Sequence, residues 1–227
     1  INESMDDDAL YTETNRIAHE LDSTRQTSGV RYIQKSHLLE DVYAYNDFSH
    51  KGDNAGCLKK KKSTPDRKKG QLISEFNGHM FPTKSFDCED HTTEHMLRHA
   101  RVMNAYYKEK DIAGGFGWCM FDYNTHQDFG SGDRICYHGV TDMFRNKKPA
   151  GELYFAQQEA EPVLEVFSSL EIGEHPGGYV GDVYLATNAD TVRVYKNDRF
   201  VKEIKTKDTA FKKMPHGPLM IDEFIGD

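Results

Sequence analysis

The sequence predicts a mixed α/β protein in which residues 1–160 form part of a (β/α)8 TIM barrel and residues 161–227 form an all-β sandwich segment. Strand and helix patterns alternate up to residue 158, as they do in a barrel of parallel strands. An apolar strand ends at Glu75, the position at which such barrels carry catalytic groups. After Pro162, short strand patterns follow one another without intervening helices, which is typical of a β-sandwich.

The elements of the barrel part follow from the spacing of apolar residues. Apolar positions at helical spacing predict helices over residues 6–25, 89–110 and 143–158. Runs of β-branched and aromatic residues predict strands over residues 28–33, 41–48, 71–75 and 112–123. The alternation supplies about five strands, whereas a closed barrel needs about eight strands and roughly 250 residues. The sequence therefore predicts an incomplete barrel.

Polar residues between these elements predict loops. One such stretch runs from Ser49 to Gly70 and contains the lysine run at residues 59–62, and another covers residues 124–138. A lysine run can bind phosphate or nucleic acid, but aromatic residues for base stacking do not flank this one. We therefore expect a solvated loop there.

The last part of the chain reads as a series of short strands. They are predicted over residues 163–168, 179–187, 191–196 and 199–205. Asn197-Asp198 is the expected hairpin turn between the last two. The change from alternating elements to consecutive strands places a domain boundary near residue 160.

Composition excludes several classes of partner. The net charge of −8, the isoelectric point near 5.8 and the mean hydropathy of −0.76 predict a chain with no nucleic-acid partner. No apolar stretch approaches the roughly 20 residues of a membrane span, so no membrane partner is expected. Because the sequence starts Ile1-Asn2-Glu3 without methionine, the true N-terminus is expected upstream, which leaves a cytoplasmic or periplasmic location open.

The four cysteines predict neither a metal centre nor a disulfide framework. They fall at wide, irregular spacings without a CxxC pair, at Cys57, Cys88, Cys119 and Cys136. Free thiols are therefore expected, and Cys119, inside a predicted apolar strand, is expected to pack as a small hydrophobic residue. The sequence calls for no cofactor.

Two glutamates have the setting that glycosidic bond cleavage requires. Glu75 ends one predicted strand, and Glu3 precedes the first helix, so the two carboxylates can converge at one end of a parallel sheet. In this reading Glu3 is the general acid/base and Glu75 the nucleophile. Asn2 would bond the sugar 2-hydroxyl, and Trp118, the single tryptophan, would stack on the sugar ring. The alternative for Glu3 and Glu75 is that each is a surface glutamate or a helix cap. The alternative for Trp118 is that it packs in the core.

A zinc site is a competing interpretation. His91-Thr-Thr-Glu-His95 matches the HxxEH pattern, in which two histidines on one helix face bind zinc and a glutamate acts as base. His95 and His99 have the same spacing, and the sequence offers no clear third ligand. A solvated helix face is therefore preferred, and no metal is expected.

Four longer motifs point to a family. They are Ile73-Ser-Glu-Phe-Asn-Gly-His-Met-Phe-Pro-Thr-Lys84, Glu94-His-Met-Leu-Arg-His-Ala-Arg101, Gly117-Trp-Cys-Met-Phe-Asp-Tyr-Asn124 and Asp133-Arg-Ile-Cys-Tyr-His-Gly-Val140. In this order they closely resemble the catalytic barrel of bacterial β-galactosidases of glycoside hydrolase family 2. Ile1-Asn2-Glu3-Ser4 resembles that family's Asn-Glu signature at the end of the fourth barrel strand.

The resemblance implies roles for particular residues. It makes Glu3 the acid/base, Glu75 the nucleophile and Trp118 a platform at the end of the eighth strand. The sugar contacts that it implies are Asn2, Asn46, His79, Lys84, Trp118 and Asp122. It also implies a tyrosine bonded to the nucleophile, for which Tyr43 and Tyr45 are candidates, while Phe48 follows Asn46-Asp47.

The resemblance also implies a domain order and a substrate. Residues 1–160 would hold about strands 4 to 8 of the glycosidase barrel, and residues 161–227 would belong to an immunoglobulin-like sandwich. A sugar-binding jelly roll, a first sandwich and the early barrel strands would lie upstream, so the chain by itself is expected to be inactive. The implied activity is retaining hydrolysis of terminal β-D-galactosides in an oligosaccharide or glycan. Alternatives are β-glucuronidase, β-mannosidase or a non-catalytic carbohydrate-binding fragment. Exposed strand edges favour a homo-oligomer.

Overall fold

The computed structural model describes residues 7–49, 57–78, 81–125, 132–172 and 180–222. Contacts divide the chain into two compact units. Unit 1 comprises residues 1–80 and 105–119, and unit 2 comprises residues 81–104 and 120–227. The predicted boundary near residue 160 remains a prediction.

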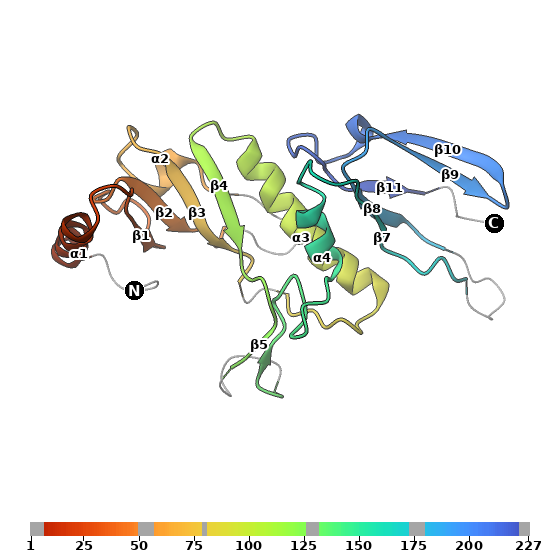
Figure 1. The fold of residues 1–227 in the computed structure, drawn as a ribbon, viewed down its shortest axis with the longest axis horizontal. Helices are drawn as coiled ribbons and strands as arrows, with labels where there is room; N and C mark the ends of the chain where they lie inside the picture. Colours follow the sequence, from red (N-terminus) through yellow and green to blue (C-terminus); the bar gives the residue numbers. More distant parts are fainter. Residues whose placement is uncertain (1–6, 50–56, 79–80, 126–131, 173–179, 223–227) are drawn as a thin grey trace. The chain divides into compact units, whose positions relative to one another are not determined.

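Unit 1 is built on a parallel four-stranded sheet. Its strands are β1 (Ser28–Arg31), β2 (Val42–Asn46), β3 (Gln71–Phe76) and β4 (Ile112–Gly117), side by side in that order (Figure 1). The inner strands supply the core, because Tyr43, Ala44, Ile73 and Phe76 are all buried. Helix α1 (Asp8–Leu21) lies beside β1, where the Tyr11 hydroxyl donates to the Val30 carbonyl at 2.8 Å. The four strands predicted from the sequence are confirmed; β1, β2 and β4 are shorter than predicted, and β3 ends one residue later.

A short helix, α2 (Lys60–Ser63), replaces part of the expected loop. Lys59, Lys61 and Lys62 are exposed as predicted, but the prediction of a solvated run is wrong for Lys60, which is 5% exposed. The Lys60 ammonium donates to the Lys69 carbonyl, so its stem can be buried while the charge keeps a partner. Ser63 donates to Gln71 Oε1 at 2.8 Å and accepts from the Tyr43 hydroxyl through its carbonyl at 2.9 Å.

The strand expected over residues 112–123 ends at Gly117, and the Trp118-Cys119 peptide bond is cis. Beyond it, the chain pairs with a later segment instead of continuing β4. Thr141 donates its N–H to Met120 O, and Asp122 donates its N–H to Thr141 O, both at 3.0 Å. Two short strands, β5 (Tyr123–Asn124) and β6 (Ile135–Cys136), then form an antiparallel pair within the predicted loop.

The helices expected at 89–110 and 143–158 are present in shorter form. Helix α3 (Glu89–Tyr107) buries Met96, Ala100 and Met103 at helical spacing, whereas Tyr107, the fourth residue of the predicted apolar face, is 44% exposed. Helix α4 (Pro149–Phe155) begins six residues later than expected, because proline fits the first helical turn, where its missing N–H costs nothing.

Consecutive antiparallel strands form the end of unit 2. Strands β7 (Leu164–Val166), β8 (Val183–Thr187) and β11 (Leu219–Ile221) make one sheet in the order β11-β8-β7. Strands β9 (Thr191–Lys196) and β10 (Arg199–Lys205) form a hairpin, followed by the 3-10 turn η1 (Thr206–Asp208). The predicted turn is confirmed: Asn197 and Asp198 have φ of 48° and 63°, as a hairpin turn with two left-handed residues requires.

All four cysteines are free thiols, as expected. Cys119, however, lies beyond the end of β4 and is only partly buried. Within the described ranges, no helix is long and apolar enough to cross a membrane.

Candidate active site

Glu75 lies near the carboxyl end of β3, where it is 7% exposed. The register with β2 shifts just before it. Tyr45 stands opposite Ile73, but the next residue, Asn46, stands opposite Glu75, so Ser74 is an extra residue on β3. Such a bulge turns the following side chain. Here it brings Asn46 and Glu75 to the same face of the sheet.

The side chains of Ser74, Asn46 and Glu75 form a chain of hydrogen bonds. Ser74 Oγ donates to Asn46 Oδ1 at 2.8 Å, and Asn46 Nδ2 donates to Glu75 Oε2 at 2.9 Å. Asn46 is 1% exposed, so its amide is held in the interior. The implied sugar contact at Asn46 is therefore, in the structure, a direct partner of the proposed nucleophile.

Gly78 lies close to both Glu75 and Trp118. A Cβ atom at position 78 would lie 2.8 Å from Glu75 Oε1 and 3.6 Å from Trp118 Cβ. Trp118 is half-buried, and its backbone N–H donates to the Phe76 carbonyl at 2.7 Å. Residues at the ends of β3 and β4 thus place the Glu75 carboxylate and the Trp118 side chain close to the same glycine.

The tyrosine candidates lie on the buried strand β2. The Tyr43 hydroxyl donates to the Ser63 carbonyl. Burial raises the pKa of Tyr45 to about 12, with the nearby Asp47 carboxylate adding to the shift and a hydrogen bond with Gln34 opposing it. Asn46 donates a hydrogen bond to Glu75 from the same strand.

Three predicted site residues, Asn2, Glu3 and His79, lie outside the described residues. The separation of the two carboxyl groups, which distinguishes retaining from inverting glycosidases, is therefore not among the described distances.

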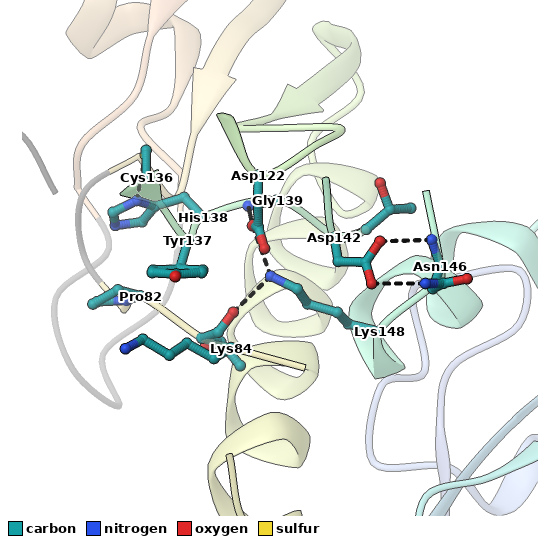
Figure 2. A network of polar contacts seen from close by, with 12 residues as sticks. Pro82, Lys84, Asp122, Cys136, Tyr137, His138, Gly139, Asp142, Asn146 and Lys148 are labelled. Carbon is teal, nitrogen blue, oxygen red and sulfur yellow. Dashed lines mark hydrogen bonds and ion pairs between the residues drawn. The ribbon is translucent and has the colours of Figure 1, made fainter. Parts of the chain in front are cut away.

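Asp122, in unit 2, is 5% exposed and takes part in a buried ion pair (Figure 2). Its Oδ1 accepts from Lys148 Nζ at 2.7 Å and from the Gly139 N–H at 2.9 Å. Lys148 also donates to the Thr83 carbonyl at 2.6 Å. Burial raises the pKa of Asp122, and the Lys148 ammonium and the Gly139 N–H oppose that shift. Asp122 thus joins three separate segments of the chain.

Lys84, also in unit 2, lies among aromatic rings. Its ammonium is 4.8 Å from the centre of the Tyr137 ring (Figure 2). It is 5.6 Å from the centre of the Phe86 ring. The Tyr137 hydroxyl donates to Asp133 at 2.6 Å, and this bond is the main cause that raises the pKa of Tyr137 to about 12. Lys84 can present a cation next to an exposed aromatic face.

The residues of the HxxEH motif have other contacts. His91 stacks on the Phe81 ring with centroids 4.2 Å apart, and its Nε2 lies 3.0 Å from the Pro82 carbonyl oxygen. His95 and His99 are 3% and 0% exposed, so the prediction of a solvated helix face is wrong for these two residues. Within the part of the chain that the structure describes, no three histidine, cysteine or acidic side chains are grouped as metal ligands.

Several residues around Glu75 and Asp122 were not predicted as site residues from the sequence. They are Ser74, Gly78, Cys136, His138, Gly139 and Lys148. Cys136 Sγ lies 2.9 Å from His138 Nδ1, and both residues are buried. Ser74 and Gly78 adjoin Glu75 in the sequence, which was an available signal. The partners of Asp122 become visible only in three dimensions.

Comparison with curated proteins finds relatives along nearly the whole chain, whereas no protein-family model matches it. A β-galactosidase of Thermoanaerobacterium thermosulfurigenes is 49% identical over 226 residues, which is 98% of this chain and 32% of that protein. A β-galactosidase of Thermoanaerobacter pseudethanolicus is 43% identical over 222 residues, 96% of this chain and 29% of that protein. The chain thus spans about a third of the length of these relatives.

Comparison with solved structures supports the fold. A β-glucuronidase of Bacteroides uniformis matches 96% of this chain with a TM-score of 0.66, at 17% sequence identity and over 28% of its own length. At that identity the match concerns the fold alone.

Proposed function

We propose that this chain, which is 49% and 43% identical to two curated β-galactosidases, belongs to glycoside hydrolase family 2 and carries the catalytic carboxylates of a retaining β-galactosidase. The observation that carries the proposal is the setting of Glu75. It lies near the carboxyl end of a parallel strand, is bonded to Asn46, and lies close to Gly78, which also adjoins Trp118. A carboxylate and an indole at adjacent strand ends suit a site that holds and attacks a sugar ring.

The proposed reaction is a double displacement. The Glu75 carboxylate attacks the anomeric carbon, and Glu3 gives its proton to the departing glycosidic oxygen. Glu3 then takes a proton from water, which attacks the same carbon and releases the sugar from Glu75. Trp118 would support the sugar ring, and Asn2 would bond the 2-hydroxyl. His79, Lys84 and Asp122 stay proposed contacts, with Asp122 acting from the interior through its ion pair.

The architecture of the complete protein is part of the same proposal. The parallel sheet β1 to β4 supports assignment to barrel strands 5 to 8, with Glu3 at the end of strand 4. The antiparallel strands β7 to β11 support an immunoglobulin-like sandwich after a boundary near residue 160. The names of the relatives favour a galactoside over a glucuronide or a mannoside.

The first test compares substrates and one substitution in the full-length protein. The nitrophenyl β-galactoside should be the best substrate among the β-galactoside, β-glucuronide and β-mannoside. Glu75→Gln should lower kcat by at least about 1,000-fold, because the amide cannot attack the anomeric carbon. The measurement is steady-state hydrolysis at several pH values.

Glu20→Gln on helix α1 is the matched control, since Glu20 is exposed and pairs with Arg16 at the surface. It should retain wild-type activity. A faster glucuronide or mannoside would refute the galactoside assignment. Full activity in Glu75→Gln would refute the role of Glu75.

A further inference from the structure

We propose that Asn46 is a positioning residue that orients the Glu75 carboxylate, rather than a contact to the sugar. The inference rests on the proposed function of Glu75 as the nucleophile. It concerns how β2 and β3 prepare that carboxylate before substrate arrives.

The bulge on β3 makes this contact geometrically available. Residues directly opposite each other on neighbouring strands point to the same face, and successive residues alternate between faces. If the register after Tyr45 and Ile73 continued regularly, Asn46 would stand opposite Ser74, and Glu75 would point to the other face. Because Ser74 is inserted, Asn46 stands opposite Glu75 instead.

Ser74 also decides which end of the Asn46 amide meets the carboxylate. Its hydroxyl donates to Asn46 Oδ1. The amide nitrogen is thereby directed to Glu75 Oε2, and an ionised carboxylate can only accept hydrogen bonds. Ser74 thus fixes the amide in the one orientation that suits an ionised Glu75.

Burial strengthens the hydrogen bond between Asn46 and Glu75. Asn46 and Glu75 are 1% and 7% exposed, so water competes little for the bond between them. Hydrogen bonds to a charged group are stronger than neutral ones, particularly in a low-dielectric interior. One oxygen, Oε2, is held by Asn46, while Oε1 faces the side-chain-free position of Gly78. The rotation of the carboxylate is thereby restricted.

The test uses Asn46→Ala and Ser74→Ala in the full-length protein. Asn46→Ala should lower kcat/KM by about 100-fold and Ser74→Ala by about 10-fold, because the donor is lost in one and loosened in the other. Since the lost bond favours ionised Glu75, the acidic limb of the kcat/KM profile should move to higher pH by about one unit in Asn46→Ala. Covalent labelling by a 2-deoxy-2-fluoro-galactosyl fluoride should slow in parallel.

Aryl galactosides that each lack one hydroxyl group show whether Asn46 orients Glu75 or contacts the sugar. If Asn46 positions Glu75, Asn46→Ala should reduce kcat/KM by the same factor for the parent galactoside and for each deoxy analogue. If Asn46 contacts a hydroxyl, its effect should disappear for the analogue that lacks that hydroxyl, and this result would overturn the proposal.

Asn146→Ala is the matched control, because it removes an exposed amide that bonds Asp142 in a surface turn. It should leave activity and pH profile unchanged. An unshifted acidic limb in both Asn46→Ala and Ser74→Ala would also overturn the proposal. If the acidic limb is unshifted but Glu75→Gln is inactive, the positioning role of Asn46 is wrong and the nucleophile role of Glu75 stands. If Glu75→Gln is active, the nucleophile role itself is wrong. Ser74→Ala keeps the test decisive should Asn46→Ala fail to fold.

Discussion

Because Gly78 has no side chain, the Glu75 carboxylate can lie close to the backbone at position 78. The atom that an added Cβ would meet first is Glu75 Oε1, at 2.8 Å, which is closer than such atoms normally approach. Because that oxygen is the end of a flexible side chain, the carboxylate can move aside without disturbing the strands. Gly78 therefore serves the site more than the stability of the sheet.

Gly78→Ala should separate activity from stability. We expect kcat/KM to fall by about 100-fold, because a displacement of about 1 Å in a reacting group costs that much. The unfolding temperature should change by only a few degrees. Kinetics and thermal unfolding of the same preparation measure both quantities.

Gly70→Ala provides the comparison, since nothing lies within 4 Å of a Cβ added there. It should change neither quantity. Wild-type kinetics in Gly78→Ala would show that Glu75 tolerates the added methyl group in place.

Helix α3 carries a buried pair of histidines. The rings of His95 and His99 meet edge to face with centroids 5.0 Å apart, and His99 Nδ1 lies 3.0 Å from the Tyr154 hydroxyl. Burial lowers the pKa of His95 well below its usual value, and His99, Lys148, His138 and His91 add to the shift. The folded protein therefore holds His95 in its neutral form.

This lowered pKa predicts a loss of stability in acid. The unfolded chain protonates His95 near the ordinary pKa of about 6.5, whereas the folded chain does so only at lower pH. As pH falls below about 6.5, the free energy of unfolding should decrease by up to about 1.4 kcal/mol per pH unit for this residue. His95→Gln should reduce that slope in urea unfolding at pH 7.5, 6.5 and 5.5.

His37→Gln, which alters an exposed histidine paired with Asp8, is the control and should leave the slope unchanged. Equal slopes in wild type and His95→Gln would show that other groups control the acid response.

Local patterns predicted most elements, and the errors have a common cause. The strands of the parallel sheet and the hairpin turn at Asn197-Asp198 depend on neighbours in sequence. Helix α2 depends instead on Lys60 finding the Lys69 carbonyl and on Ser63 finding Gln71. Such partners come from tertiary folding, which overrides the polar composition of the segment.

On the scale of the molecule, β1 and β4 are the outer strands of the described parallel sheet. Among the described strands, neither β1 nor β4 has a neighbour on its outer side. Phe116 on β4 is 62% exposed. Unpaired strand edges with apolar side chains favour association.

The purified 227-residue chain should therefore self-associate through β4. Phe116→Lys should shift it toward the monomer, because a charge on an edge strand opposes pairing with another copy. Light scattering after size-exclusion chromatography at several concentrations measures the mass.

Phe144→Lys changes an 85% exposed phenylalanine outside the sheet and should leave the association unchanged. A wild-type chain that stays monomeric at every concentration would contradict the expectation.

The sequence by itself determined the alternation of strands and helices, the position of Glu75 near a strand end, the free cysteines and the family resemblance. These follow from side-chain periodicity and short motifs, which act over a few neighbouring residues. Only the tertiary structure decided which partners the functional side chains have. Asn46 and Glu75 are 29 residues apart, and Asp122 and Lys148 are 26 apart. Their contacts depend on a bulge and on the packing of separate segments, and no local pattern encodes either.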